Sequence, residues 1–180
     1  MTHVKTIERR GFLGVVSTST LAMLTRADRV RAAQQPRLHR RVVTGVNDAG
    51  MSIVTSDGPA PLEGAWGVDV ADLWLLNHVP VDLSDSRDPI AGYKKQAWPP
   101  AGGVIVRTGT WHPGFSIRIH RSATIDFLFV ISGRVELLLD ESSVTLGSGD
   151  CVVQRGTNHG WRVVGDEPCT WGVVLLAAKS

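Results

Sequence analysis

The chain has little cysteine, which excludes a disulfide-rich scaffold and a zinc knuckle. Cys151 and Cys169 are the only two cysteines in 180 residues, and no Cys-x-x-Cys pair is present. We expect both to be small buried strand residues, with a single bridge as the alternative if the protein is exported. The fold must then be stabilised by an apolar core, which 43% hydrophobic residues can supply.

The sequence also lacks basic patches interleaved with aromatic residues, the pattern typical of nucleic-acid binding. Residues 1–36 hold six Lys and Arg against two Asp and Glu, so the net charge of +2 divides into +4 in that segment and −2 in the remainder. No stretch after residue 36 has the pattern of a long helix, so parallel βαβ units, which need crossover helices, are excluded. We therefore predict an all-β fold with no nucleic-acid partner.

Residues 1–33 resemble an export signal that lies outside the fold. A charged start precedes the uncharged stretch 11–24, and Ala32 and Ala33 follow it. The string ERRGFLG at residues 8–14 resembles the twin-arginine motif, which implies an exported, periplasmic protein. If the segment is instead a frayed amphipathic helix, the protein is cytoplasmic. The apolar stretch is too short and too rich in Ser and Thr to be a stable membrane anchor.

Residues 38–180 are predicted to form one all-β domain. Eleven short β-rich runs alternate with turn strings such as SDGPAP, NHVP and GSGD, which is typical of a sandwich or barrel. The stretch Asp82–Pro100 has no clear period and holds three prolines, so we expect a loop that covers one mouth of the barrel. The predicted strands are 41–45, 51–55, 72–76, 103–107, 116–121, 125–131, 134–140, 143–146, 151–154, 159–164 and 170–176.

Two histidines and one carboxylate, His120, Asp126 and His159, lie on neighbouring predicted strands. Such a set can occupy one face of a divalent metal ion and leave positions open for a substrate or dioxygen. A histidine on a strand can equally be an ordinary core or surface residue. These three residues are the main candidates for a functional site.

Strand parity predicts which side chains accompany them. Side chains alternate between the two faces of a strand, so Arg118, His120 and Ser122 are expected inside the barrel, with Ile117 and Ile119 outside. By the same parity, Trp161 and Val163 share a face with His159. We therefore expect Arg118, Ser122 and Trp161 to line a substrate pocket, although Arg118 could simply pair with an acid and Trp161 could fill the core.

The same segment resembles the first motif of the cupin superfamily, whose members are double-stranded β-helix or jelly-roll barrels. Gly114, His120, Asp126 and Gly133 fall at the spacings of that motif. Two positions depart from it, because Ser122 stands in place of the second histidine and Asp126 in place of the glutamate. The resemblance implies a barrel whose metal-ligand set is reduced.

The second cupin motif is represented by Gly156 and His159 in the string QRGTNHGW. The usual proline before the glycine is missing, and Val163 stands where an asparagine is common. The strings RRVVTG, SDGPAP, HRSATIDF and VVQRGTNHGW together resemble a subgroup of small stand-alone cupins from bacteria and from fungal secondary-metabolite clusters. This resemblance extends from Arg40 to about Ala177.

The resemblance implies that a small organic molecule is bound in the barrel, and it leaves three functions open. In the first, His120, Asp126 and His159 hold a divalent metal (Fe, Mn, Zn or Ni) in an oxygenase, decarboxylase or lyase acting on a carbonyl, enol or aromatic metabolite. In the second, Asp126 is too short to reach a metal. A histidine is then the base of a metal-free lyase or isomerase, and Arg118 steadies the negative charge. The third is a non-catalytic binder or sensor. The resemblance also implies a homodimer.

Overall fold

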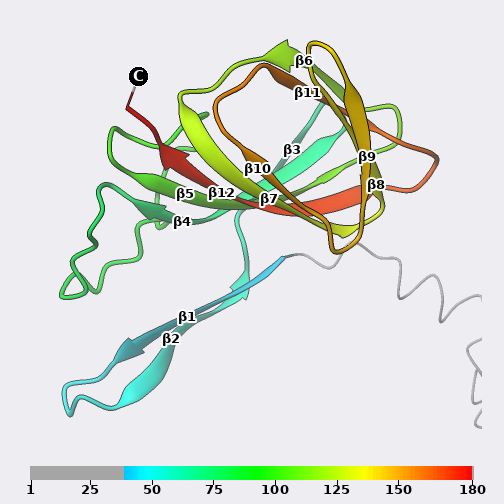
Figure 1. Cartoon of the computed structure of the whole chain (residues 1–180). Helices are drawn as coiled ribbons and strands as arrows, with labels where there is room; N and C mark the ends of the chain where they lie inside the picture. Colours follow the sequence, from blue (N-terminus) through cyan, green and yellow to red (C-terminus); the bar gives the residue numbers. More distant parts are fainter. Residues whose placement is uncertain (1–38, 180) are drawn as a thin grey trace, which may run out of the picture. The chain divides into compact units, whose positions relative to one another are not determined.

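The fold consists of antiparallel strands. The computed structural model describes residues 39–179, all within the unit Arg37–Ser180, and the export segment predicted for residues 1–33 lies outside them. Twelve strands are arranged in three sheets (Figure 1). Within residues 39–179, no helix is long and apolar enough to cross a bilayer.

Two of the sheets form the walls of a barrel (Figure 1). The larger has the order β10 (Cys151–Gln154), β7 (Thr124–Ser132), β12 (Cys169–Ala177), β5 (Val104–Trp111), β4 (Val68–Leu76) and β3 (Leu62–Ala65). The smaller has the order β6 (Ser116–His120), β11 (His159–Val163), β8 (Arg134–Leu138) and β9 (Ser143–Gly147). Strands distant in sequence pair within each sheet, which confirms the predicted double-stranded β-helix.

The third sheet is the hairpin of β1 (Arg40–Val46) and β2 (Ser52–Pro59). The predicted break at SDGPAP is wrong, because Ser56–Pro59 continue β2 and pair with the start of β1. Proline is tolerated here since Pro59 is the last residue of its strand. The strings RRVVTG and SDGPAP are therefore the two halves of one hairpin, joined by hydrogen bonds of 2.7 and 2.6 Å from the Arg40 guanidinium to the Asp57 carboxylate.

Strand β3, which the sequence patterns did not predict, is joined to β4 by a tight turn. Ala65 pairs with Val68, so only Trp66 and Gly67 lie between the strands. Their φ angles are 54° and 81°, as a type I′ turn requires. A bulky residue rarely adopts positive φ, and the Trp66 side chain is also 96% exposed. This turn therefore carries local backbone strain.

The core of the barrel is built around three tryptophans. The ring of Trp111 lies 4.8 Å from that of Trp171 and 5.5 Å from that of Trp161, measured between centroids. Val135 and Cys169 are completely buried in the same cluster. Burial of these large apolar groups provides the main driving force for closing the two sheets on each other.

Cys151 and Cys169 are both free thiols, on different strands of the larger sheet. Cys169 is fully buried, as predicted. The same prediction is wrong for Cys151, which is exposed at the start of the edge strand β10. The sequence could not show that β10 is an edge strand with one face outside the barrel.

Candidate functional site

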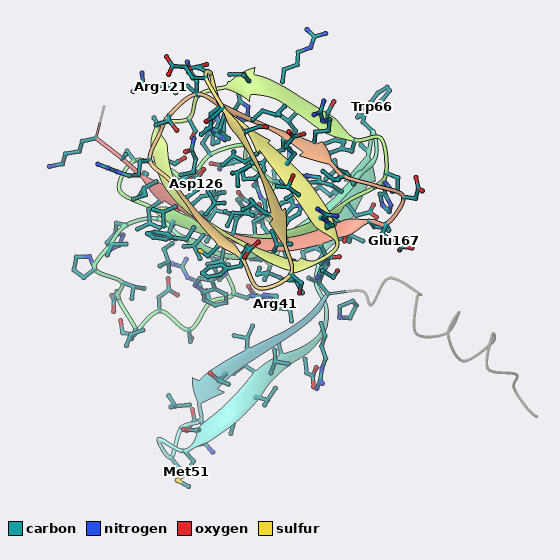
Figure 2. The ribbon with its side chains drawn as sticks, turned by 45° about the vertical axis from the view of Figure 1, so that its right-hand side comes forward. Arg41, Met51, Trp66, Arg121, Asp126 and Glu167 are labelled. Atoms are coloured by element: carbon teal, nitrogen blue, oxygen red, sulfur yellow. The ribbon has the colours of Figure 1, made fainter. Side chains whose placement is uncertain are left out.

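The two predicted histidines meet across the smaller sheet. His120 ends β6 and His159 begins β11, and the two residues are direct partners in the antiparallel register. Their ring centroids are 4.4 Å apart. Asp126 is buried on β7, which belongs to the opposite wall (Figure 2). The structure therefore places all three candidates in one region of the barrel.

A β-bulge beside this pair changes the parity of β6. His159 pairs with His120, but Trp161 pairs with Ile117, so the register shifts between them. Ile117 consequently packs against the core, together with Trp161. Arg118 is exposed. The predicted interior position of Arg118 is therefore wrong, as is the predicted exterior position of Ile117, because a bulge inserts one unpaired residue and inverts the alternation.

The ring of His159 is held by its Nδ1 side. Nδ1 lies 2.9 Å from the carbonyl oxygen of Thr157, to which it can donate in the Nδ1–H tautomer. The amide nitrogen of Gln154 donates to the Thr157 carbonyl oxygen at 2.7 Å. It also contacts His159 Nδ1, and because an amide nitrogen only donates, this contact is a hydrogen bond in the Nε2–H tautomer and not in the Nδ1–H tautomer. In the Nδ1–H tautomer, which the Thr157 carbonyl favours, the lone pair of Nε2 is available to act as a base or a ligand.

His120 is held in the same way. Its Nδ1 lies 3.0 Å from the carbonyl oxygen of Arg118, which also favours the Nδ1–H tautomer. Trp98, from the long connection between β4 and β5, lies with its ring centroid 6.4 Å from that of His120. The two imidazoles are thus both oriented by backbone carbonyls, an arrangement that also serves metal-binding histidines.

Burial changes the proton affinity of the site. Desolvation raises the pKa of Asp126 above its ordinary value, although the nearby Thr124 hydroxyl and the two histidines oppose the rise. Desolvation also lowers the pKa of His159, which the bond to Thr157 only partly offsets. Asp126 Oδ1 has no hydrogen-bond partner among the described residues. A buried carboxylate oxygen without a partner is costly, and such groups are common at functional sites.

The three candidate ligands are not gathered around one point. Within residues 39–179, no group of three or more His, Cys, Asp or Glu side chains is arranged to hold a metal ion. Asp126 is one methylene shorter than the glutamate of the cupin motif and starts from the opposite wall. The three side chains as positioned therefore do not fit a three-ligand metal site, and bound metal stays a prediction.

The predicted pocket residues Ser122 and Trp161 are both buried. The hydroxyl of Ser122 accepts a hydrogen bond of 2.9 Å from Thr124 Oγ1, which leaves the Ser122 proton available for donation. Trp161 belongs to the core cluster, and its ring meets that of His159 edge-on at 6.0 Å. Trp161 therefore supports the histidine from the core side.

The predicted loop over residues 82–100 is confirmed as a connection without strands, and it is anchored at two points. Arg107 of β5 donates to the carbonyl oxygen of Gln96 at 2.6 Å and pairs with the buried Asp72 at 2.5 Å. Arg41 of β1 binds both carboxylate oxygens of Asp88 and stacks over Trp74. These anchors help to place Trp98 near His120.

Sequence patterns missed the residues that hold the site in place, chiefly Gln154, Thr157 and Thr124. Gln154 faces Asp126 across the β10–β7 pair, and both are buried. A buried glutamine on an otherwise apolar strand is a signal that could have been recognised once the register of β10 was known. The anchors Arg107 and Asp72 carry no motif at all.

The barrel, with a pair of histidines and a buried carboxylate inside it, defines a double-stranded β-helix protein with a polar internal site. The model of the Cupin domain matches residues 105–176, which extend from β5 to β12. Oryzines biosynthesis cluster protein J of Aspergillus oryzae is 37% identical, over 71% of this chain and 75% of that protein. The chain therefore belongs to the cupin superfamily.

Two further proteins extend this comparison. The cupin-domain-containing oxidoreductase virC of Hypocrea virens is 28% identical, over 87% of this chain and 86% of that protein. Among solved structures, the cupin domain of Cnp3 from Schizosaccharomyces pombe is 10% identical, covering 77% of this chain and 87% of that chain with a TM-score of 0.48.

Proposed function

We propose that this protein binds a small organic molecule with an enolisable carbonyl group and catalyses proton transfer on it without a metal. The observation that carries the proposal is the orientation of the histidine pair, in which both Nδ1 atoms face backbone carbonyls and neither Nε2 atom has a hydrogen-bond partner within residues 39–179. The names of the relatives, a biosynthesis cluster protein and an oxidoreductase, favour a role in small-molecule metabolism.

His159 is the base in this proposal. Burial lowers its pKa, so the ring is neutral and able to accept a proton at neutral pH. His159 Nε2 takes the proton from the carbon next to the carbonyl. The electron pair of the broken C–H bond moves to the carbonyl oxygen and forms an enolate. The Asp126 carboxylate stabilises the imidazolium by its charge.

Ser122 and His120 complete the cycle. The Ser122 hydroxyl, which already accepts from Thr124, donates to the enolate oxygen. His120, whose ring adjoins that of His159, accepts the proton from the His159 imidazolium and returns it to carbon at the same or a neighbouring position, so that both rings end the cycle neutral. The outcome is an isomerisation, or an elimination if the substrate carries a leaving group. Arg118 has no part in this scheme because it is exposed.

Proton exchange tests this function directly, because it detects the first chemical step whatever the final product is. The protein is incubated in D₂O with a panel of enolisable keto and β-dicarbonyl compounds, and deuterium incorporation is followed by NMR. We expect exchange with at least one compound, and His159→Ala should slow it by about 100-fold or more. His78→Ala, which alters an exposed histidine of the β4–β5 connection, is the matched control and should exchange normally. Ligand binding without exchange would contradict the proposal and favour a non-catalytic binder.

A metal-assisted oxygenase or decarboxylase is the second candidate, because Asp126 Oδ1 has no hydrogen-bond partner among the described residues, although the three side chains as positioned do not form a three-ligand site. Metal analysis of protein purified without chelator separates the two. The acid–base proposal expects much less than one metal per chain. One metal per chain that is lost in both His120→Ala and His159→Ala would overturn it in favour of the metal site.

A further inference from the structure

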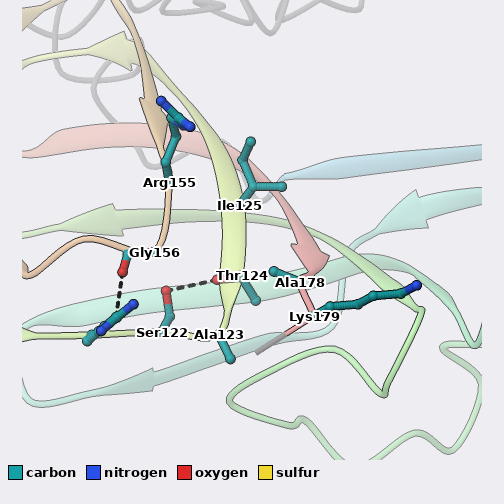
Figure 3. Close-up of a pocket in the computed structure, with 9 residues that line it drawn as sticks. Ser122, Ala123, Thr124, Ile125, Arg155, Gly156, Ala178 and Lys179 are labelled. Atoms are coloured by element: carbon teal, nitrogen blue, oxygen red, sulfur yellow. Dashed lines mark hydrogen bonds between the residues drawn. The ribbon is translucent and has the colours of Figure 1, made fainter.

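The outer face of the larger sheet is apolar where β10, β7 and β12 lie side by side (Figure 1). Core residues such as Leu128 and Val173 define the inner face of these strands, and the alternate residues point outward. Figure 3 shows this at the start of β7, where the Thr124 hydroxyl is bonded to Ser122 and Ile125 extends away from that bond. The outward positions, here called the outer patch, are Ile125, Phe127, Phe129, Ile131, Cys151, Val153, Thr170, Gly172, Val174 and Leu176.

The outer patch has the composition of a covered surface. An antiparallel sheet with one face in water normally alternates apolar and polar residues. No position of the outer patch carries a charged residue. Phe129, Ile131 and Val153 are nevertheless 48%, 54% and 52% exposed. A contiguous apolar face of this kind marks an interaction surface.

The cover that the chain itself provides ends one strand away. Thr108 of β5 also points outward, opposite Gly172, and it is buried with its hydroxyl 3.3 Å from Nδ1 of His39. Val104, on the same outer row of β5, is buried as well. The outward residues of β12 are only half-buried, and those at the end of β7 are exposed. Within residues 39–179, the chain therefore covers β5 and leaves β7 and β10 open.

The outer patch is complementary in shape to itself. Phe129 pairs with Gly172 on one side and with Cys151 on the other, so its large ring stands between two small residues. A Cβ at Gly172 would meet only the end of Ile131, at 3.8 Å, so the glycine leaves a shallow hollow beside the ring. In a pair of copies related by a two-fold axis, the Phe129 ring of each can rest over the Gly172 hollow of the other.

The charge of the patch also favours a second copy over other surfaces of the chain. The β1–β2 hairpin exposes Val42 and Val54, but Val42 stands directly opposite Asp57, which is paired with Arg40. Packing this mixed surface onto the uncharged patch would bury charged groups in apolar surroundings, which is costly. An equally uncharged patch on another copy carries no such cost.

The area of the patch indicates how strong such a contact is. The three strands have 4, 9 and 9 residues, and each strand residue occupies about 16 Å² of a sheet. The flat area is therefore about 350 Å² per copy, and two copies bury at least about 700 Å². This is less than the roughly 1,200 Å² of stable complexes, so the contact belongs to the weak class that dissociates in the micromolar range.

We propose that the outer patch is the interface of a two-fold homodimer, in which the sheets of two copies pack face to face. The interface covers the back of the strands that carry Asp126 and Gln154 on their inner face. It does not depend on the reaction proposed above, because no residue of the histidine pair belongs to the patch.

Sedimentation velocity of the full chain between about 1 and 200 µM tests the interface. We expect the sedimentation coefficient to rise from that of a monomer to that of a dimer over this range. Phe129→Glu should raise the dissociation constant at least about 100-fold, because the dimer then buries two unpaired charges. Val153→Thr, a milder change of similar shape, should raise it about tenfold. Circular dichroism checks that each variant is folded.

Two matched variants show where the contact lies. Ile119→Glu alters an apolar residue of the smaller sheet that is 46% exposed, and it should leave the dissociation constant unchanged. Val46→Glu alters the exposed hairpin and should also leave it unchanged. A dimer that is lost in Val46→Glu but kept in Phe129→Glu would overturn the proposal in favour of an interface formed by the hairpin.

The labelling rate of Cys151 gives a second readout, because this exposed thiol belongs to the outer patch. We expect the rate with Ellman's reagent to fall as the protein concentration rises, while the end point stays at one thiol per chain. The rate in Phe129→Glu should not depend on concentration. A protein that is monomeric at every concentration would overturn the dimer. Fast labelling of that monomer would mean that the patch is open, and slow labelling that other residues of the same chain cover it.

Discussion

His120 and His159 are cross-strand partners on β6 and β11, and their rings lie 4.4 Å apart above the tryptophans of the core. The carboxylate of Asp126 comes from the other wall of the barrel and has one oxygen without a partner. Such an arrangement is unfavourable for stability, so it provides a direct test of whether these residues were retained for function.

Asp126→Asn should make the protein more stable at neutral pH. Burial raises the pKa of Asp126 in the folded state above the ordinary value of 3.8, so the folded protein holds this proton more tightly than the unfolded chain does. The free energy of unfolding of the wild type therefore falls relative to that of the variant as the pH rises from about 4 to the pKa of Asp126 in the folded protein. Above that pKa, the difference between the two free energies is constant. Urea unfolding from pH 3 to pH 8 measures it. A wild type that gains stability over the variant as pH rises would contradict the prediction.

Trp66→Asn should stabilise the β3–β4 turn. Trp66 adopts a φ of 54° at the first position of a type I′ turn, where asparagine is preferred. Relief of this strain is worth about 1 kcal/mol, or about 2–4 °C in Tm for a chain of this size. Thermal unfolding by circular dichroism checks it. Trp66→Val, which keeps an apolar residue and adds a β-branch, should be no more stable than the wild type.

Arg41→Ala should loosen the long β4–β5 connection. The Arg41 side chain is 10% exposed, and it binds Asp88 with two hydrogen bonds and the carbonyl oxygen of Leu73 with a third. Its loss should cost about 1–2 kcal/mol and speed limited proteolysis within residues 77–103. Arg40→Ala is the matched control, because its bidentate pair with Asp57 is exposed and should contribute nothing measurable. Equal proteolysis of both variants would show that Arg41 does not anchor the connection.

Thiol labelling should distinguish the two cysteines. Burial raises the pKa of Cys169 to about 11 and shields it from reagents, whereas Cys151 is exposed. We expect one thiol per chain to react with Ellman's reagent at pH 8 in the native protein and two after unfolding in guanidinium. Cys151→Ser should leave no reactive native thiol. If the unfolded, unreduced protein has no free thiol, the two cysteines form a bridge and the prediction fails.

The fold was largely accessible from the sequence because short alternating runs and turn strings are strong signals in an all-β chain. Strand β3 was missed because Leu62–Ala65 is exposed and has no alternation. The run through Ser56–Pro59 was missed because Gly and Pro usually interrupt strands, and only the pairing with β1 shows that they do not do so here.

The sequence predicted where the site lies, but it did not predict which neighbouring side chains face it. The cupin motifs brought His120, Asp126 and His159 to one region, because two of their glycines are fixed by geometry. A Cβ at Gly133 would lie 2.2 Å from the carbonyl oxygen of Pro168, and Gly156 has positive φ. The place of Arg118 was not accessible, because a bulge depends on pairing with β11 and no local pattern marks it. The homodimer expected from the resemblance stays a prediction.

The cluster of Trp111, Trp161 and Trp171 has a consequence for how such barrels diversify. These three rings pack the two sheets against each other through apolar contacts that do not involve the histidines. The residues around the histidines can therefore change while the main apolar packing of the barrel is kept. Substitutions such as serine for the second histidine of the motif are then tolerated by the fold as they arise. Related proteins can therefore evolve different reactions at the same site while they keep the same tryptophan cluster.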